Sequence, residues 1–206
     1  LNHITKYHWM YNEQVTVPIT IRTPMGGGRG YGPTHSQTLE KHFFGMSGLS
    51  VVAPSPFHDP GQLLEHSVLG TDHPTLFVEN KLMYARRLRT IDLSGRTEWM
   101  HTATTSGDYP TITISYQPLQ KADVTLVTYG GTAEMAVAAA KTLLMSDETI
   151  CEVILPSQLQ PLDMTPIIES LKRTGRLVVC EEGAETGGWG AEVIGRVTAE
   201  AFDALR

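Results

Sequence analysis

The sequence predicts an α/β protein whose mostly parallel strands are covered by helices. Short runs rich in Val, Ile and Leu recur along the chain, and segments with helical periodicity separate most of them. This alternation is typical of buried parallel strands joined by crossover helices. Hydrophobic residues make up 41% of the 206 residues and charged residues 18%, as in a folded protein with its own core.

In the first half, strands and helices are predicted to alternate. The predicted strands are runs of apolar or β-branched residues: 15–22, 49–53 and 75–79. Residues 34–37, Thr-His-Ser-Gln, fit a capping box that would open a helix extending to about residue 44. Asp59 followed by Pro60 predicts the N-cap and the first position of a helix over 60–69.

The second half is predicted to continue this alternation more regularly. Its expected strands are 111–116 (an edge strand), 124–128, 150–155 and 177–180, and its expected helices are 132–146, 166–173 and 191–205. The longest helix carries an apolar stripe of Met135, Ala139 and Leu143, with a second stripe one residue further along. Residues 85–110 show no clear period, so they are interpreted as a linker or crossing segment.

Charge and histidine are distributed unevenly. Residues 1–103 have 9 basic and 8 acidic side chains, whereas residues 104–206 have 7 basic and 14 acidic ones. All 8 histidines lie in the first part, which is therefore expected to contain the chemistry. The net charge of −6 argues against a nucleic-acid-binding surface. No apolar run reaches the ~18 residues of a membrane-spanning helix, so neither nucleic acid nor membrane is an expected partner.

Disulfide and metal chemistry are not indicated by the residue types. The two cysteines, Cys151 and Cys180, exclude a disulfide framework and a multi-cysteine zinc site. Both lie in predicted strands and are expected to be buried, unreactive thiols. The spacing of the histidines matches no metal-ligand motif.

The glycine-rich loop over 25–33 leads directly to the strongest candidate residue, His35. Tyr31 stands where the dinucleotide fingerprint needs glycine, so either close backbone approach to a ligand or a flexible turn would explain the glycines. In the first turn of the predicted helix, a neutral imidazole of His35 could bind a carboxylate or carbonyl group or move a proton. A surface histidine without a function is the alternative interpretation from spacing alone.

Several runs of sequence carry a resemblance to a known family. They are Arg22-Thr-Pro-Met-Gly-Gly, Gly32-Pro-Thr-His-Ser-Gln-Thr-Leu-Glu40, Val51-Val-Ala-Pro-Ser-Pro56, Phe77-Val-Glu-Asn-Lys-Leu-Met-Tyr84, Asp123-Val-Thr-Leu-Val-Thr-Tyr-Gly130, Gln160-Pro-Leu-Asp163, Glu181-Glu-Gly and Gly187-Gly-Trp-Gly-Ala-Glu192. Together and in this order, they resemble the beta subunits of thiamine-diphosphate-dependent 2-oxo acid dehydrogenases. These transketolase-like subunits belong to the decarboxylating components of pyruvate and branched-chain complexes.

The resemblance implies a domain organisation and a site. The chain would lack the N-terminal part of such a subunit: residues 1–88 would be the later portion of a pyrimidine-binding α/β domain, 89–118 a linker, and 119–206 a transketolase C-terminal domain. His35 would be the active-site histidine. Its neighbours Tyr31, Gly32, Ser36 and Gln37 would lie near the cofactor or the substrate.

The resemblance also implies cofactors and partners. Thiamine diphosphate with Mg²⁺ would be bound mainly by parts outside this chain, and no position here matches the family's cofactor-activating glutamate. Some relatives hold a structural monovalent cation before the strand at 75–79, but Gly70-Thr-Asp-His73 does not clearly match that loop. The implied partners are an alpha subunit, a second beta subunit, and a lipoyl acyltransferase core that docks on the C-terminal domain. The compartment would be the cytoplasm in a bacterium or the mitochondrial matrix in a eukaryote.

Two other functions remain open from the sequence. One is another transketolase-like thiamine-diphosphate enzyme, such as an acetoin-cleaving one, and the other is a non-catalytic assembly or docking fragment. Leu155-Pro-Ser-Gln158 stands where the family usually has an Asp-Leu-Arg-Thr-like segment, so the 2-oxo acid is not defined. Lipoyl-dependent acylation would separate a dehydrogenase from its relatives. Cofactor binding would separate either enzyme from a docking fragment.

Overall fold

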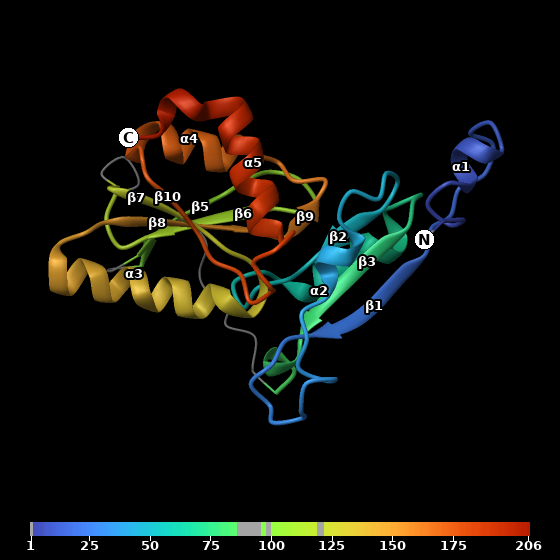
Figure 1. Ribbon diagram of the computed structural model, residues 1–206, viewed down its shortest axis with the longest axis horizontal. Coiled ribbons are helices and arrows are strands. Elements are labelled where there is room, and N and C mark those ends of the chain that lie inside the picture. The colour runs from blue at the N-terminus through green and yellow to red at the C-terminus, as the bar shows by residue number, and fades with distance from the viewer. Residues whose placement is uncertain (1, 86–95, 98–99, 119–121) are drawn as a thin grey trace.

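The computed structural model describes residues 2–85, 96–97, 100–118 and 122–206, which form two β-sheets with helices packed around them (Figure 1). The α/β class predicted from the sequence is confirmed. The first sheet has four strands in the order β1-β3-β2-β9: Thr20–Met25, Thr75–Asn80, Ser50–Val52 and Gln158–Gln160. The second sheet has six strands in the order β10-β7-β8-β6-β5-β4: Leu177–Val179, Val124–Val127, Cys151–Pro156, Thr111–Ser115, Met100–Thr104 and Arg96–Thr97.

The three strands that the first half contributes to the first sheet run parallel to one another, as the sequence predicted. Strands β1 and β2 both pair in parallel with β3, and helix α2 (Pro60–Leu69) connects β2 to β3. The predicted N-cap is confirmed, because Asp59 Oδ1 accepts hydrogen bonds from Gly61 N at 2.8 Å and Gln62 N at 3.1 Å. The register runs from Thr20 opposite Thr75 to Met25 opposite Asn80, so β1 and β3 end at the same edge.

The second sheet is covered by helices on both faces. Strands β10, β7 and β8 are parallel, and helices α3 (Ala133–Asp147), α4 (Thr165–Thr174) and α5 (Trp189–Ala201) follow β7, β9 and β10 along the chain. Helix α3 lies on one face, whereas α4 and α5 lie on the other (Figure 1). Strands β6, β5 and β4 extend the sheet beyond β8 in antiparallel pairing.

Residues 85–110 were interpreted as a linker or crossing segment without regular structure, but their described part contains strands. Strand β5 pairs with β6 from His101 opposite Ser115 to Thr104 opposite Ile112, and β6 also pairs with β8. Residues 111–116 therefore contain an interior strand, not an edge strand. Strand β5 is only partly buried, so its threonine-rich sequence contains few apolar residues. It therefore shows no alternating strand pattern. Residues 86–95 lie outside the described residues.

The helix predicted over 34–44 is also wrong. Only a short 3₁₀ helix, Glu40–Phe43, forms there. The carbonyl of Gln37 accepts a hydrogen bond from Gly26 N at 3.0 Å, so the chain folds back on the end of β1 instead of continuing a helix. The predicted strand at 15–22 begins only at Thr20, after Pro18, which has no N–H to donate. A short helix, α1 (Tyr7–Met10), was not predicted.

Strand β9 was not predicted, and it joins the two halves of the chain. It pairs antiparallel with β2, with Gln160 opposite Val51 and Gln158 opposite Val52, so the second half completes the first sheet. One hydrophobic cluster also contains side chains of both sheets, including Val51, Val78, Val127 and Ile154. The two halves are therefore held together by shared packing as well as by strand pairing.

Helix α3 buries the second of the two apolar stripes predicted for it. Its buried residues are Ala133, Ala136, Val137 and Ala140. Met135 is 66% exposed, and Leu143 is also exposed. The second stripe, one residue further along, faces the sheet because small alanine side chains let the helix approach β8 closely. In the part of the chain that the structure describes, no helix is both long and apolar enough to span a membrane.

Candidate functional site

The glycine-rich loop after β1 is shaped by contacts with the second half of the chain. Gly27 N donates to Glu182 Oε1 at 2.6 Å, and Asn80 Nδ2 donates to Glu182 Oε2 at 3.1 Å. Gly26 has a φ of +92°, and a Cβ there would lie 2.8 Å from Asn80 Nδ2. At this position the glycine is needed because the backbone approaches the protein's own side chains. Gly30 and Gly32 also have positive φ values, but no atom lies within 4 Å of where a Cβ would be.

His35 lies in a turn directly after the glycine-rich loop and is exposed to solvent. The helix N-terminus expected around it is absent from this described segment, so no helix dipole acts on the imidazole. The carbonyl of His35 accepts a hydrogen bond from the ammonium group of Lys81, which follows β3 directly. The loop that carries His35 is therefore tied to the edge where β1 and β3 end, which is where parallel sheets usually bind ligands.

A cavity of about 330 Å³ lies at this edge and includes His35. Its lining residues come from the end of β1, from β3 and the lysine directly after it, and from the segment 34–43: Thr23, Pro24, Met25, Thr34, His35, Gln37, Leu39, Glu40, Phe43, Leu76, Val78 and Lys81. We call it the His35 cavity. Of the residues proposed from the sequence, the structure brings His35 and Gln37 together here. Tyr31, Gly32 and Ser36 are not among its lining residues.

Glu40 was not identified from the sequence as a site residue. It is only 3% exposed, and its Oε1 accepts a hydrogen bond from the hydroxyl of Tyr129, which follows β7 in the second half. Burial is the main factor that raises the pKa of Glu40, and the Tyr129 hydrogen bond partly opposes it. Burial likewise raises the pKa of the Tyr129 hydroxyl. The position of this carboxyl becomes evident only from its hydrogen bond with Tyr129, which lies 89 positions further along the chain. Local sequence patterns therefore contain no signal for it.

Glu181 and Glu182 connect this region to the start of α5. Glu181 Oε2 accepts from Trp189 N at 3.0 Å, and its Oε1 accepts from Gly190 N at 3.1 Å. A carboxylate at this position satisfies free N–H groups of the first turn and complements the helix dipole. The Trp189 side chain is fully buried and packs edge-on against Tyr129, with ring centroids 5.0 Å apart. The Glu181-Glu182 pair therefore fixes both the loop and the helix beside the cavity.

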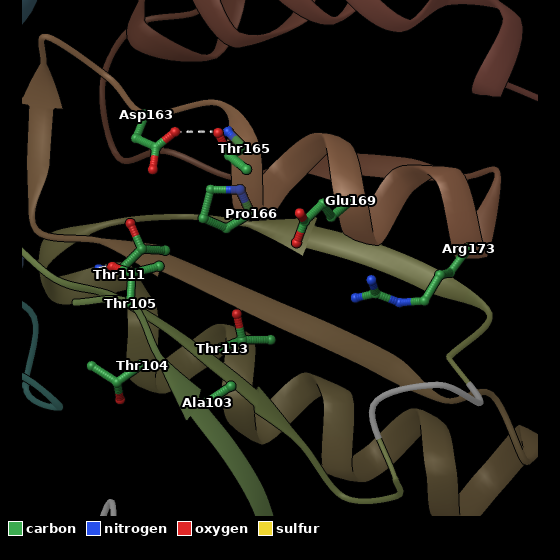
Figure 2. A pocket seen from close by; sticks show the side chains of 10 residues that line it. All are labelled: Ala103, Thr104, Thr105, Thr111, Thr113, Asp163, Thr165, Pro166, Glu169 and Arg173. Atoms are coloured by element: carbon green, nitrogen blue, oxygen red, sulfur yellow. Dashed lines mark hydrogen bonds between the residues drawn. The ribbon is translucent and has the colours of Figure 1, made fainter.

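A second cavity, of about 340 Å³, lies in the second half between β5, β6 and the start of α4 (Figure 2). Threonines from the two strands face Asp163, Glu169 and Arg173 across it (Figure 2). Asp163 Oδ1 accepts from Thr165 N at 2.9 Å, and Arg173 Nη2 donates to Glu152 Oε2 at 2.6 Å. Asp163 and Arg173 are thus engaged in fold contacts, and this cavity shares no lining residue with the His35 cavity.

Metal-ligating and thiol groups are not gathered at either cavity. Among the described residues, no three His, Cys, Asp or Glu side chains are grouped so that they could hold a metal ion. Cys151 is buried in β8 and Cys180 is partly buried after β10. Burial raises the pKa of both thiols, as expected for unreactive cysteines.

Several known proteins are similar to this chain in sequence, and one solved structure is similar to it in fold. Residues 117–206 match the family described as transketolase, C-terminal domain. The chain is 36% identical over 206 residues to a pyruvate dehydrogenase E1 component subunit beta from Rickettsia bellii (strain RML369-C), covering 100% of this chain and 58% of the relative. It is 34% identical over 202 residues to a 3-methyl-2-oxobutanoate dehydrogenase subunit beta from Mycobacterium tuberculosis (strain CDC 1551 / Oshkosh), covering 98% and 54%.

A solved structure supports the same fold at lower sequence similarity. A split gene transketolase in an inactive beta4 tetramer superposes with a TM-score of 0.64 and 19% identity, covering 95% of this chain and 58% of that one. The fold of the chain is therefore transketolase-like, and residues 117–206 match a transketolase C-terminal domain. Over nearly its whole length the chain is similar in sequence to the beta subunits of a pyruvate dehydrogenase and a 3-methyl-2-oxobutanoate dehydrogenase. It spans only 54–58% of the length of these two relatives.

Proposed function

We propose that this chain is part of the beta component of a thiamine-diphosphate-dependent 2-oxo acid dehydrogenase. Such a component decarboxylates a 2-oxo acid and transfers the acyl group to a lipoyl group. The observation that supports this proposal most directly is the similarity to beta subunits of two dehydrogenases over at least 98% of the chain. The position of the His35 cavity, at the shared end of parallel strands β1 and β3, agrees with it.

Within this function, His35 is the proposed catalytic residue. Bound thiamine diphosphate would supply the carbanion chemistry that cleaves the bond to the 2-oxo acid's carboxylate. This chain would orient the substrate and manage protons through His35, whose imidazole is exposed at the cavity and can donate or accept a hydrogen bond. Gln37 lines the same cavity and would contact cofactor or substrate. Tyr31, Gly32 and Ser36 are proposed only as neighbours of the site.

The cofactor site is proposed to be composite. The described residues contain no cluster of acidic or histidine side chains that could hold Mg²⁺, and Lys81 already donates to the carbonyl of His35. We therefore assign the diphosphate and Mg²⁺ mainly to an alpha subunit, and only the His35 side of the site to this chain. A second beta subunit would complete the assembly. The acidic second half would dock on a basic surface of a lipoyl acyltransferase core, through contacts that weaken as salt rises.

Titration and reconstitution together test this function. The 206-residue chain alone should give no saturable calorimetric signal with thiamine diphosphate and Mg²⁺ below millimolar concentrations, equivalent to roughly −4 kcal/mol. An incomplete site must still offset the entropy of holding the ligand with fewer contacts. Assembly with an alpha subunit should then produce lipoyl-dependent acylation with pyruvate or 3-methyl-2-oxobutanoate.

Each result separates the proposal from its alternatives. Micromolar cofactor binding by the isolated chain would contradict the composite site. An assembly that binds cofactor but acylates no lipoyl group would favour another thiamine-diphosphate enzyme, such as an acetoin-cleaving one. An assembly that forms but binds no cofactor would favour a docking fragment.

A further inference from the structure

Glu40 has one oxygen engaged and one oxygen free. Its Oε1 accepts from the Tyr129 hydroxyl, but its Oε2 is buried and has no hydrogen-bond partner among the described residues. Glu40 is also one of the residues that line the His35 cavity. A buried polar atom without a partner destabilises a fold by roughly 1–3 kcal/mol, so its retention calls for an explanation. A ligand in the cavity would supply the missing partner.

The charges around Glu40 favour its neutral form. Burial raises its pKa most strongly, and the nearby carboxylates Glu181 and Glu182 raise it further, against the opposing hydrogen bond from Tyr129. The basic groups that line the cavity are His35 and Lys81, and Lys81 donates to a backbone carbonyl. No ion pair joins Glu40 to either of them among the described contacts. In the neutral form, one oxygen accepts from Tyr129 and the other bears a proton that can be donated.

We propose that Glu40 is a ligand-binding residue of the His35 cavity, a carboxylic acid that donates a hydrogen bond from Oε2 to a carbonyl or carboxylate oxygen of the bound 2-oxo acid. The identity of this ligand rests on the function proposed above. His35 and Glu40 thus line one cavity as two different hydrogen-bonding groups, an imidazole and a carboxyl.

Tyr129 is the positioning residue for this acid. It is 2% exposed, lies just after β7 and packs against the buried ring of Trp189. Its hydroxyl holds Oε1, which leaves Oε2 as the oxygen that is free to donate. The second half of the chain therefore contributes to the cavity of the first half, in addition to any role in docking.

Carbodiimide labelling of the 206-residue chain tests the protonation and accessibility of Glu40. Dicyclohexylcarbodiimide adds to protonated carboxyl groups in apolar surroundings, and the modified residue can be mapped by mass spectrometry. At neutral pH, Glu40 should be labelled at least about tenfold faster than the exposed carboxyls of Glu13 and Glu192. Labelling of Glu40 no faster than these controls would overturn the proposal. Tyr129→Phe removes the hydrogen bond that lowers the pKa of Glu40, so its labelling should persist to higher pH.

Two substitutions test ligand binding in the assembly with an alpha subunit. Glu40→Gln can still accept from Tyr129 and donate into the cavity, so the KM for the 2-oxo acid should stay within about threefold of wild type. Glu40→Ala removes the donor and should raise KM about tenfold, in line with the loss of one hydrogen bond. A Gln variant as impaired as the Ala variant would show that Glu40 must ionise and would overturn the proposal.

These experiments distinguish an incorrect role for Glu40 from an incorrect proposed function. Acylation that is insensitive to Glu40→Ala would reject the role of Glu40 and leave the dehydrogenase function intact. Selective labelling of Glu40 that pyruvate does not slow in the active assembly would also reject ligand binding by this residue. An assembly without acylation would reject the function itself, whatever the labelling result.

Discussion

The loop that carries His35 and the sheet of the second half differ in what determines their conformation. Helix α4 ends at Thr174 and is followed by Gly175 with a φ of +70°, a C-terminal signal that is visible in the sequence. The His35 loop instead depends on the hydrogen bond between Gly27 and Glu182, which lie 155 positions apart. The part of the molecule proposed to perform chemistry is therefore the part with the weakest local determinants.

The largest expected effect is on catalysis, and it tests the proposed role of the loop that carries His35. His35→Ala in the assembled enzyme should lower lipoyl acylation by about 10²–10⁴-fold, the range for general acid–base groups. Thermal stability should change little, because the His35 side chain is exposed. Steady-state acylation rates and thermal unfolding measure the two effects. His42→Ala is the matched control, since His42 is exposed but does not line the cavity, and wild-type turnover in His35→Ala would reject the assignment.

The second prediction concerns an ion pair in the second half between a buried carboxylate and a guanidinium that is 38% exposed. Glu152 is fully buried, and Arg173 Nη2 lies 2.6 Å from its Oε2. Arg173→Ala should lower the free energy of unfolding by about 3–5 kcal/mol, because it leaves a buried carboxylate without its partner. Chemical denaturation measures the loss, and Lys172→Ala, an exposed neighbour on α4, is the control. Glu152→Gln should restore part of the stability of Arg173→Ala, and no restoration would count against the ion pair as the cause.

The third prediction concerns pH and the junction between the halves. His58 Nδ1 accepts from Ser55 N at 3.1 Å, so Nε2 carries the proton and donates to the carbonyl of Pro110 at 3.2 Å. Burial lowers the pKa of His58 to about 4, compared with 6.5 for an unperturbed histidine. Protonation therefore favours the unfolded chain. Stability should be complete above about pH 6.5 and fall by about 3 kcal/mol as the pH drops to 4.

Denaturation at several pH values checks this expectation. His58→Gln removes the titrating group, so the stability of that variant should change less between pH 6.5 and 4 than the stability of wild type. His42→Gln, which removes an exposed histidine, should keep the wild-type pH dependence. A His58→Gln variant with an unchanged pH profile would show that other groups are responsible.

The smallest expected effect is a loss of stability in two glycine variants of the glycine-rich loop. Comparing the two losses distinguishes backbone strain from steric contact with the rest of the protein. Gly26→Ala should destabilise the protein by about 2 kcal/mol, because it combines a positive φ with a clash at Asn80. Gly30→Ala introduces a side chain at a φ of +72° with no atom within 4 Å, so only the strain of about 1 kcal/mol should remain. Denaturant midpoints of the two variants give the difference. Equal losses would mean that contact with Asn80 and Glu182 does not shape the loop.

Much of the fold was predictable from local patterns. The predicted ranges for β3, α2 and β8 agree with the observed bounds to within one residue, because capping residues and continuous apolar runs define such elements locally. The helix at 34–44 failed because Thr34 and the residues after it resemble a capping box, while the chain there folds back through Gly26. Strands β5 and β9 are short and rich in polar residues, so their pairing partners, and not their own sequence, make them strands.

The sequence by itself determined the α/β class, the cap of α2, the glycine loop and the choice of His35 as the residue to test. These properties depend on residue type and on spacing along a few turns or strands. Only the tertiary structure decided that Gln37 lines the cavity and Tyr31 does not, and that Glu40 is held by Tyr129. Burial and long-range hydrogen bonding arise when distant segments pack together, and they decide which polar groups can change their pKa or meet a ligand.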